Sequence, residues 1–250
     1  MYNYYLKIIP SCKSTNDEVK YSGKRGVKEG FSILALEQTK GRGSKNNLWI
    51  SQRGNMFMST LLRPDVSKKY WSQISLIIGI SIVQMLLDIG IKENEIKIKW
   101  PNDILINLKK ISGILVESMD DFVIVGVGLN VLHHPGGQLS KYNSVSLSSI
   151  ISTKKFQLDQ LAHLLLKKIY YNYKKWKINH IQPFVKDINS FLAFIDKPLS
   201  FIWNNERKFG KLIGIDEEGL LKISNNNKEF KILSTDHYFL SEGENYVSSD

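Results

Sequence analysis

Cysteine is almost absent from this chain of 250 residues, and the single Cys12 has no second thiol to pair with. A disulfide framework is therefore excluded, and the composition suits a reducing compartment, so we expect a cytoplasmic location. A lone thiol is more often a small buried filler than a catalytic group. The first residues, 1–5, lack the basic start and long apolar centre of a signal peptide, so we expect the chain to stay where it is made.

Arginine is scarce although the chain is basic. The 34 basic and 24 acidic residues give a formal charge of +10, which raises nucleic-acid binding as a function of a different class. Nearly all of the cations are lysines, and they accompany isoleucine and asparagine in every segment. We interpret this as a compositional bias and disfavour a nucleic-acid-binding module, because a surface that reads DNA would concentrate arginine.

No uninterrupted apolar run is long enough to indicate a membrane span. The most apolar stretch, residues 74–89, is broken by polar residues that include Ser81, Gln84 and Asp88, and Gly90 supplies a helix stop. We therefore expect a buried core helix and no membrane partner.

The length allows one good core plus a small appended domain. Helical periodicity over 158–176 and 181–194 predicts two helices that cover one face of a sheet. In the first of them lysines alternate with aromatic residues, and we expect the aromatics to pack inward. From about residue 196 the pattern changes to short strands separated by turns. These strands are Leu199–Trp203, Phe209–Ile215, Leu220–Ile223 and Phe230–Leu233. We expect domains over 1–195 and 196–250, the second a small antiparallel barrel.

Charged residues interrupt the apolar strands around residues 99–117. Pro101 cannot donate to a strand ladder, so the alternating run 95–99 ends there. The polar segment 107–110 predicts a turn between the apolar runs 104–106 and 111–116, with Lys110 at the returning lip of a hairpin. Taken alone, this lysine is more simply a surface residue whose stem covers apolar area.

A glycine-containing loop, residues 38–49, follows a second strand-like run. Its glycines let backbone amides face an anion closely. It carries neither the Gly-Lys-Ser/Thr ending of a nucleotide triphosphatase loop nor the Gly-x-Gly-x-x-Gly dinucleotide pattern. Upstream, Ser14-Thr15-Asn16-Asp17-Glu18 predicts a helix start with a capping box, either Ser14 with Asp17 or Thr15 with Glu18.

Taken in order, these segments resemble the biotin protein ligase family, and the likeness covers residues 14 to about 131. It is carried by Ser14-Thr15-Asn16, Gln38 with Gly41-Arg42-Gly43 and Trp49, Lys99 to Asp103, Lys110 with Gly113 to Glu117, and Gly126 to Val131. The resemblance implies a synthesis of biotinyl-5′-AMP from biotin and ATP, with Mg²⁺ on the leaving pyrophosphate. Biotin then passes to a lysine of a biotin carboxyl carrier protein.

The resemblance also implies roles for individual residues. The biotin-binding residues are Ser14, Thr15, Asn16, Gln38, Gly41, Arg42, Gly43, Lys110 and Gly113. Those that bind ATP or the adenylate are Arg42, Ser44, Trp49, Lys99, Asn102 and Asn130. Arg42, Lys99 and Lys110 are the catalytic cations, which offset the repulsion between the biotin carboxylate and the triphosphate. Asp103 is the candidate metal ligand. We expect the three cations to converge on one cleft.

The family's fold is α+β, similar to class II aminoacyl-tRNA synthetases: a mixed, mostly antiparallel catalytic sheet flanked by helices, with an SH3-like C-terminal barrel. Relatives that also repress transcription carry a winged helix-turn-helix before the Ser-Thr-Asn motif. Only a short tyrosine-rich segment stands there in this sequence, so we expect a monofunctional ligase that does not bind DNA. A homodimer is possible within the family. The alternative enzyme is a lipoate–protein ligase, which shares the fold and the adenylate chemistry.

The loop departs from the family pattern after Gly43. Some relatives carry arginine where Ser44 stands, and glycine is common at the position of Asn46. Asparagine tolerates left-handed backbone angles, so the turn can survive. A neutral Ser44 should hold the adenylate phosphate less firmly, although Lys45 can supply charge from next door. We therefore predict an active enzyme with a leakier intermediate.

Overall fold

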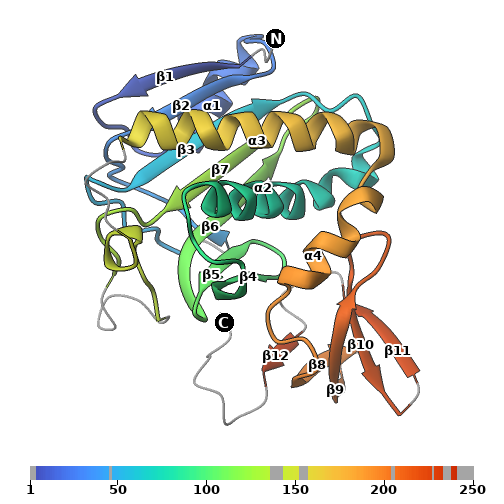
Figure 1. Ribbon diagram of the computed structural model, residues 1–250. Coiled ribbons are helices and arrows are strands. Elements are labelled where there is room, and N and C mark those ends of the chain that lie inside the picture. Colours follow the sequence, from blue (N-terminus) through green and yellow to red (C-terminus); the bar gives the residue numbers. More distant parts are fainter. Residues whose placement is uncertain are drawn as a thin grey trace.

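The computed structural model describes residues 4–44, 47–135, 143–151, 157–203, 206–226, 228–232 and 238–240. A seven-stranded sheet forms the centre of the molecule (Figure 1). Its strands lie in the order β1 (Tyr5–Ile9), β2 (Phe31–Ala35), β3 (Met56–Leu62), β7 (Val123–Leu129), β6 (Lys109–Ser118), β5 (Asp103–Ile106) and β4 (Ile96–Lys99). Only β1 and β2 pair in parallel among these described strands, so the predicted mixed, mostly antiparallel sheet is confirmed.

Helices cover the two faces of this sheet unequally. The helices α2 (Ile74–Asp88) and α3 (Leu158–Asn179) pack on one another and on one face, as Figure 1 shows. On the other face, α1 (Thr15–Lys24) contacts β2, β3 and β7. There Val19 packs with Leu61 and Ile124 in a separate small cluster of apolar residues. Because α1 is short, it covers only part of its face.

The apolar helix α2 is a core element. Residues Lys68–Asp88 are long and apolar enough to cross a membrane by length and composition, but 78% of the most apolar window is buried within the protein. Burial on nearly every side follows from contact with α3 as well as with the sheet. The prediction of a buried core helix over 74–89 is thus confirmed.

The helix α3 directs three of its four aromatic residues inward, as the sequence predicts, and the fourth outward. Tyr170, Tyr173 and Trp176 are buried, whereas Tyr171 is exposed. The indole Nε1 of Trp176 donates to Gln73 Oε1 at 2.9 Å, which satisfies the polar atom inside the core. The interpretation of this segment as an amphipathic helix is confirmed.

The hairpin of β5 and β6 differs from the prediction in its turn. Asn107 and Leu108 alone connect the strands, with φ of 49° and 60°. Two successive residues with positive φ give a tight hairpin turn whose twist matches the strands. Lys109 and Lys110 therefore belong to β6, not to the turn.

The predicted capping box at α1 is wrong. Ser14 is the N-cap residue, but its side chain makes no capping hydrogen bond. Its backbone carbonyl accepts from the amides of Asp17 and Glu18 at 3.0 and 3.2 Å. The side chains of Thr15 and Asp17 form tertiary contacts instead, with Gln38 and Arg42.

The C-terminal part forms a second sheet after α4 (Val185–Phe191). A 3-10 turn, Gln182–Phe184, precedes α4 and replaces part of the predicted helix 181–194. The strands lie in the order β11 (Lys228–Ile232), β10 (Leu221–Asn225), β9 (Glu206–Ile215), β8 (Pro198–Trp203) and β12 (Tyr238–Leu240). The small C-terminal sheet is confirmed; its closure into a barrel remains a prediction, because no pairing of β11 with β12 occurs among the described residues.

Buried hydrogen bonds attach the second sheet to the first part of the chain. Trp100 Nε1 donates to the carbonyl of Gly219 at 2.9 Å, and Gln73 Nε2 donates to that of Glu218 at 3.1 Å. Gly219 has φ of +88°, and a Cβ added there would lie 2.9 Å from Ile181. The turn before β10 therefore packs tightly against the helical layer.

Candidate active site

A cavity opens on the α1 face of the large sheet, at the N-terminal end of α1. Its lining residues come from five regions: the start of α1, the loop after β2, β3, the β5–β6 hairpin with Asn102 just before it, and β7. They are Ser14, Thr15, Asn16, Gln38, Arg42, Gly43, Ser44, Trp49, Phe57, Asn102, Asp103, Lys110, Gly113, Ile114, Leu115, Gly126, Val127 and Gly128. Most of the predicted site residues thus share one cavity.

Glycines in paired strands form the floor of this cavity. Gly113 of β6 lies opposite Gly128 of β7. A Cβ at Gly128 would lie 2.4 Å from the Trp49 ring, and one at Gly126 would lie 2.3 Å from Asn16 Oδ1. Side chains from the loop and from α1 therefore lie directly on the sheet backbone, which requires glycine at these positions.

A network of neutral polar groups forms one wall. Gln38 Oε1 accepts from the backbone amide of Thr15 at 2.8 Å and from its hydroxyl at 3.1 Å. Ser59 Oγ of β3 lies 2.7 Å from Thr15 Oγ1 and 2.6 Å from Asn16 Oδ1, and shares its hydrogen between them. Ser14, Thr15 and Asn16 are buried. This wall offers fixed donors and acceptors to a neutral polar ligand.

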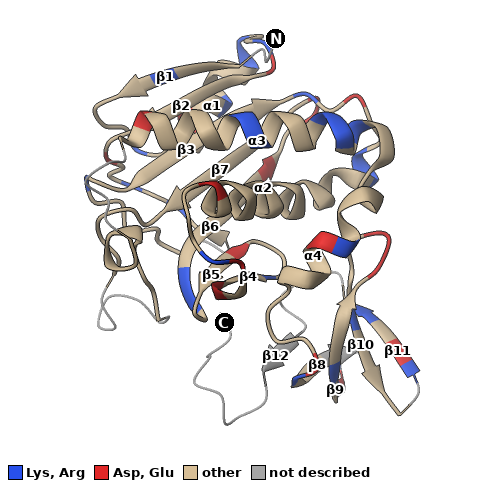
Figure 2. Cartoon of the chain, in the orientation of Figure 1, with Lys and Arg blue, Asp and Glu red and all other residues tan. Residues whose placement is uncertain are grey.

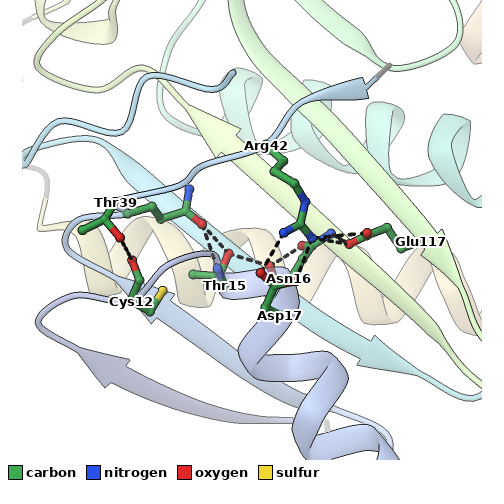
Figure 3. Close-up of polar contacts among 9 residues, drawn as sticks. Cys12, Thr15, Asn16, Asp17, Thr39, Arg42 and Glu117 are labelled. Carbon is green, nitrogen blue, oxygen red and sulfur yellow. Dashed lines mark hydrogen bonds and ion pairs between the residues drawn. The ribbon is translucent and has the colours of Figure 1, made fainter. Parts of the chain in front are cut away.

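Arg42 is held by two carboxylates, as Figure 3 shows. Its Nη1 and Nη2 donate to the two oxygens of Asp17 at 2.7 and 2.8 Å, and Nη2 lies 3.3 Å from both oxygens of Glu117. The hydrogen bond from Arg42 lowers the pKa of Asp17, and the same bond raises the pKa of Arg42. The guanidinium is therefore permanently charged and locally compensated.

Lys110 is the second cation of the cavity. Its Nζ lies 2.7 Å from Asp103 Oδ1 and 5.4 Å from the centre of the Trp49 ring. Asp103, the predicted metal ligand, is thus engaged by a lysine. No group of three or more His, Cys, Asp or Glu side chains able to hold a metal ion is found among the described residues.

Trp49 lies over the glycine floor. Its ring packs against Gly113 and Gly128, and its buried Nε1 has no hydrogen-bond partner among the described residues. A backbone hydrogen bond from Trp49 to the carbonyl of Gly41 at 3.0 Å fixes the loop beneath it. Gly41 does not line the cavity; a Cβ there would lie 2.5 Å from the Trp49 carbonyl, so glycine permits this close approach.

Two further predicted ligands, in addition to Gly41, lie outside the lining. Lys99, at the end of β4, is buried and lines a second cavity with residues that include Trp100 and Leu212. Asn130 Nδ2 donates to the carbonyl of Val145 at 3.1 Å, and Asn130 is also outside the lining. The predicted convergence of three cations on one cavity is therefore wrong for Lys99 and right for Arg42 and Lys110, because β4 lies one strand beyond the hairpin that carries Lys110. Lys45 and Asn46 lie outside the described residues.

Sequence reasoning missed several residues that shape the site. Asp17 was considered only as a capping residue, Glu117 was quoted in a motif without a role, and Ser59 was not considered. Glu117 could have been predicted from the strand pattern. It lies two residues after Leu115, so both side chains lie on the same face of β6, and Leu115 lines the cavity. Its pairing with Arg42, 75 residues away along the chain, carries no local signal.

Cys12 lies near the cavity but is not activated. Burial, with the charges of Glu18 and Asp17, raises the pKa of its thiol to about 11. The thiol is therefore protonated at neutral pH, in agreement with its interpretation as a filler.

The comparisons with known proteins agree with this geometry. A model of the biotin/lipoate A/B protein ligase family matches residues 8–130. The bifunctional ligase/repressor BirA of Bacillus subtilis is 32% identical over 243 residues, which cover 93% of this chain and 72% of that protein. A biotin protein ligase from Aquifex aeolicus, solved in complex with biotin and ATP, superposes with a TM-score of 0.82 at 30% identity over 94% of this chain and 99% of that one. The chain belongs to the biotin protein ligase family.

Proposed function

We propose that this protein is an ATP-dependent biotin protein ligase. It forms biotinyl-5′-AMP and pyrophosphate from biotin and ATP, and then transfers biotin to a lysine of a biotin carboxyl carrier protein. The observation that carries the proposal is the cavity in which Arg42 and Lys110 face a wall of neutral polar groups. The Aquifex relative, whose structure holds biotin and ATP, supports the choice of both substrates.

The residues suit both steps. A biotin carboxylate oxygen attacks the α-phosphorus, and the bond from that phosphorus to the oxygen that bridges the α- and β-phosphates breaks, so pyrophosphate leaves. The carrier lysine amine then attacks the acyl carbon, loses a proton and displaces AMP. Arg42 offers a planar fork to carboxylate and phosphate oxygens, and Lys110 a compact charge to the acyl oxygen. Both cations stabilise charge as it redistributes in the transition state.

The neutral polar groups of the cavity wall select biotin over lipoate. The ureido ring of biotin donates and accepts hydrogen bonds, whereas the dithiolane ring of lipoate does neither well. Thr15, Asn16 and Gln38 can exchange their mutual bonds for bonds to the ureido group. A ligand that leaves such buried groups unpaired is rejected strongly.

Mg²⁺ belongs to the proposal as a partner of the ATP phosphates. This cation keeps few protein ligands and binds largely through phosphate oxygens and water. Asp103 is the candidate protein ligand, and Lys110 competes for its carboxylate.

Further parts of the proposal concern the whole protein. We propose a catalytic unit over 1–195 and a C-terminal unit over 196–250, a cytoplasmic location, no DNA binding and a possible homodimer. The carrier partner is supported by the name of a relative from Mycobacterium tuberculosis, a biotin–[acetyl-CoA-carboxylase] ligase that is 33% identical over 134 residues, 52% of this chain and 50% of that protein.

A mass-spectrometric assay tests the activity. The protein is incubated with ATP, Mg²⁺, a biotin carrier domain and either biotin or lipoate. We expect the carrier to gain the mass of biotinyl and not of lipoyl, and isotope exchange between pyrophosphate and ATP to depend on biotin. A lipoyl adduct would assign the alternative ligase.

Lys110→Ala should slow formation of biotinyl-5′-AMP about 100-fold, because a positive charge is lost where negative charge develops. The matched control is Lys167→Ala on the exposed side of α3, which should leave the rate unchanged. A normal rate in Lys110→Ala would remove the role assigned to this lysine.

A further inference from the structure

The least expected feature of the cavity is the number of carboxylates around its arginine. Arg42 contacts Asp17 through both terminal nitrogens and Glu117 through Nη2. A guanidinium meant only to attract anions would be better without carboxylate neighbours, since they lower the local positive potential. The two carboxylates therefore call for a role other than attraction of the ligand.

The two carboxylates hold the guanidinium from two elements. Asp17 lies in the first turn of α1, and Glu117 lies in β6. The bidentate contact with Asp17 fixes the plane of the guanidinium, as a fork pairs with a carboxylate. The second contact, from the sheet, fixes its position in the lining of the cavity. Arg42 itself belongs to a loop, which by itself positions a side chain poorly.

Glu117 also contacts the polar wall. Its Oε2 accepts from Asn16 Nδ2 at 2.6 Å, and Asn16 Oδ1 accepts from Ser59 at 2.6 Å. Asn16 in turn lies directly on Gly126. A continuous chain of bonds thus runs from the neutral wall to the cation, as Figure 3 shows for its central members.

We propose that Asp17 and Glu117 are positioning residues for Arg42, and that Glu117 links the orientation of Arg42 to that of Asn16. This inference rests on the proposed function, because it concerns the step in which Arg42 contacts the reacting anions. Holding the fork in place before the substrates bind converts a mobile loop cation into a preorganised one, which lowers the barrier of the chemical step.

Isosteric variants test the inference. Glu117→Gln retains an oxygen that accepts from Asn16 but presents no charge to Arg42, and Asp17→Asn is the equivalent change on α1. We expect each to lower kcat of biotin-dependent ATP–pyrophosphate exchange about 10- to 100-fold, the loss typical of a displaced catalytic group. The KM for ATP should change much less. The matched control is Asp88→Asn. This change breaks the 2.7 Å ion pair between Asp88 and Lys168, which lies outside the cavity, and it should leave kcat unchanged.

A double-mutant cycle separates positioning from a general structural effect. If Glu117 acts through Arg42, then Glu117→Gln should cost almost nothing further in an Arg42→Ala background. Additive losses, or unchanged kcat in both single variants, would overturn the inference while leaving the proposed function intact. A wild-type protein without biotin-dependent exchange would instead overturn the proposed function and this inference with it. Thermal unfolding of each variant identifies any loss of folded protein.

Discussion

At the scale of the residue, Ser44 is a neutral side chain in the lining of the cavity, where the sequence predicts a weaker hold on the adenylate phosphate. A neutral side chain there leaves the adenylate phosphate with less positive charge, so biotinyl-5′-AMP should leave the enzyme more readily. We predict that Ser44→Arg lowers the ratio of released biotinyl-5′-AMP to biotin transferred about tenfold, since one charge-assisted hydrogen bond is worth about 1.5–3 kcal/mol. Quantitative mass spectrometry of both products measures the ratio.

The control for that prediction is Ser44→Ala, which changes the size of the side chain without adding charge. It should release the intermediate as fast as the natural protein does. Equal release from Ser44→Arg and the natural protein would show that Ser44 does not determine retention.

The ion pair of Asp17 and Arg42 predicts a particular pH dependence. The hydrogen bond from Arg42 keeps the pKa of Asp17 below its ordinary value of 3.8. The pair therefore stabilises the folded state fully above that ordinary value and loses its contribution as the pH falls through the lower folded pKa. Urea unfolding should give a constant difference between the natural protein and Asp17→Asn above about pH 5, and a shrinking one on acidification. A difference that varies between about pH 6 and 8 would contradict this.

Residue types in this site were predictable, and their partners were not. The order of motifs identified Arg42, Lys110 and the Ser14-Thr15-Asn16 run, all of which line the cavity. The carboxylates that hold Arg42 come from α1 and β6, and such long-range pairs leave no local pattern. For Lys99 the motif was misleading. It predicted a place in the shared cleft, but the strand that carries Lys99 puts it beside a second cavity.

At the scale of the element, the glycines of β6 and β7 set the depth of the cavity. A Cβ at Gly128 would lie 2.4 Å from the Trp49 ring, so Gly128→Ala should displace the indole and fill part of the floor. We predict about 5- to 150-fold weaker biotin binding by calorimetry, because overpacking of this kind typically costs about 1–3 kcal/mol. The fluorescence of Trp49 should change as well, which reports the displacement directly.

A glycine of α2 provides the matched control. A Cβ at Gly79 would meet no atom closer than 3.7 Å, an ordinary contact. Gly79→Ala should therefore leave biotin binding unchanged and stabilise the protein by up to about 1 kcal/mol, since alanine is the better helix residue. Equal effects of both changes on biotin binding would refute the role of the floor.

Elements with a strong period were predicted well, and their ends less well. The helices α2 and α3 begin and end within a few residues of the predicted ranges. The hairpin turn was predicted too long, because two lysines look like turn residues although their backbone continues β6. The capping box failed because the side chains that should cap α1 bond to other elements.

At the scale of the whole molecule, Gln73 joins three parts of the chain. It accepts from Trp176 of α3 and donates to the carbonyl of Glu218 before β10. Gln73→Met keeps the volume but removes the partner of the buried Trp176 indole N–H and of the Glu218 carbonyl, and an unpaired buried group costs about 1–3 kcal/mol. We predict a loss of about 3 kcal/mol in the free energy of unfolding, measured in urea. Gln160→Met, at an exposed position of α3, should change it little.

The charge of the molecule is spread rather than gathered. Figure 2 shows lysines and arginines on α3, on the hairpin and on the C-terminal strands, with acidic residues among them. Several of these lysines pair with carboxylates, as Lys168 does with Asp88 and Lys177 with Asp65. The interpretation of the basic composition as a bias rather than a docking surface for nucleic acid is consistent with this distribution.

The bonds from Trp100 and Gln73 to the turn at Gly219 have a practical consequence for anyone who wishes to shorten the protein. Ending the chain after residue 195 would remove the carbonyl groups that accept hydrogen bonds from the buried Trp100 indole and from the Gln73 amide. The apolar surface beside the end of β4 and the start of α2, which the second sheet now covers, would then be exposed to water. A protein shortened in that way should precipitate or misfold, so a version made for labelling or screening should retain the second sheet.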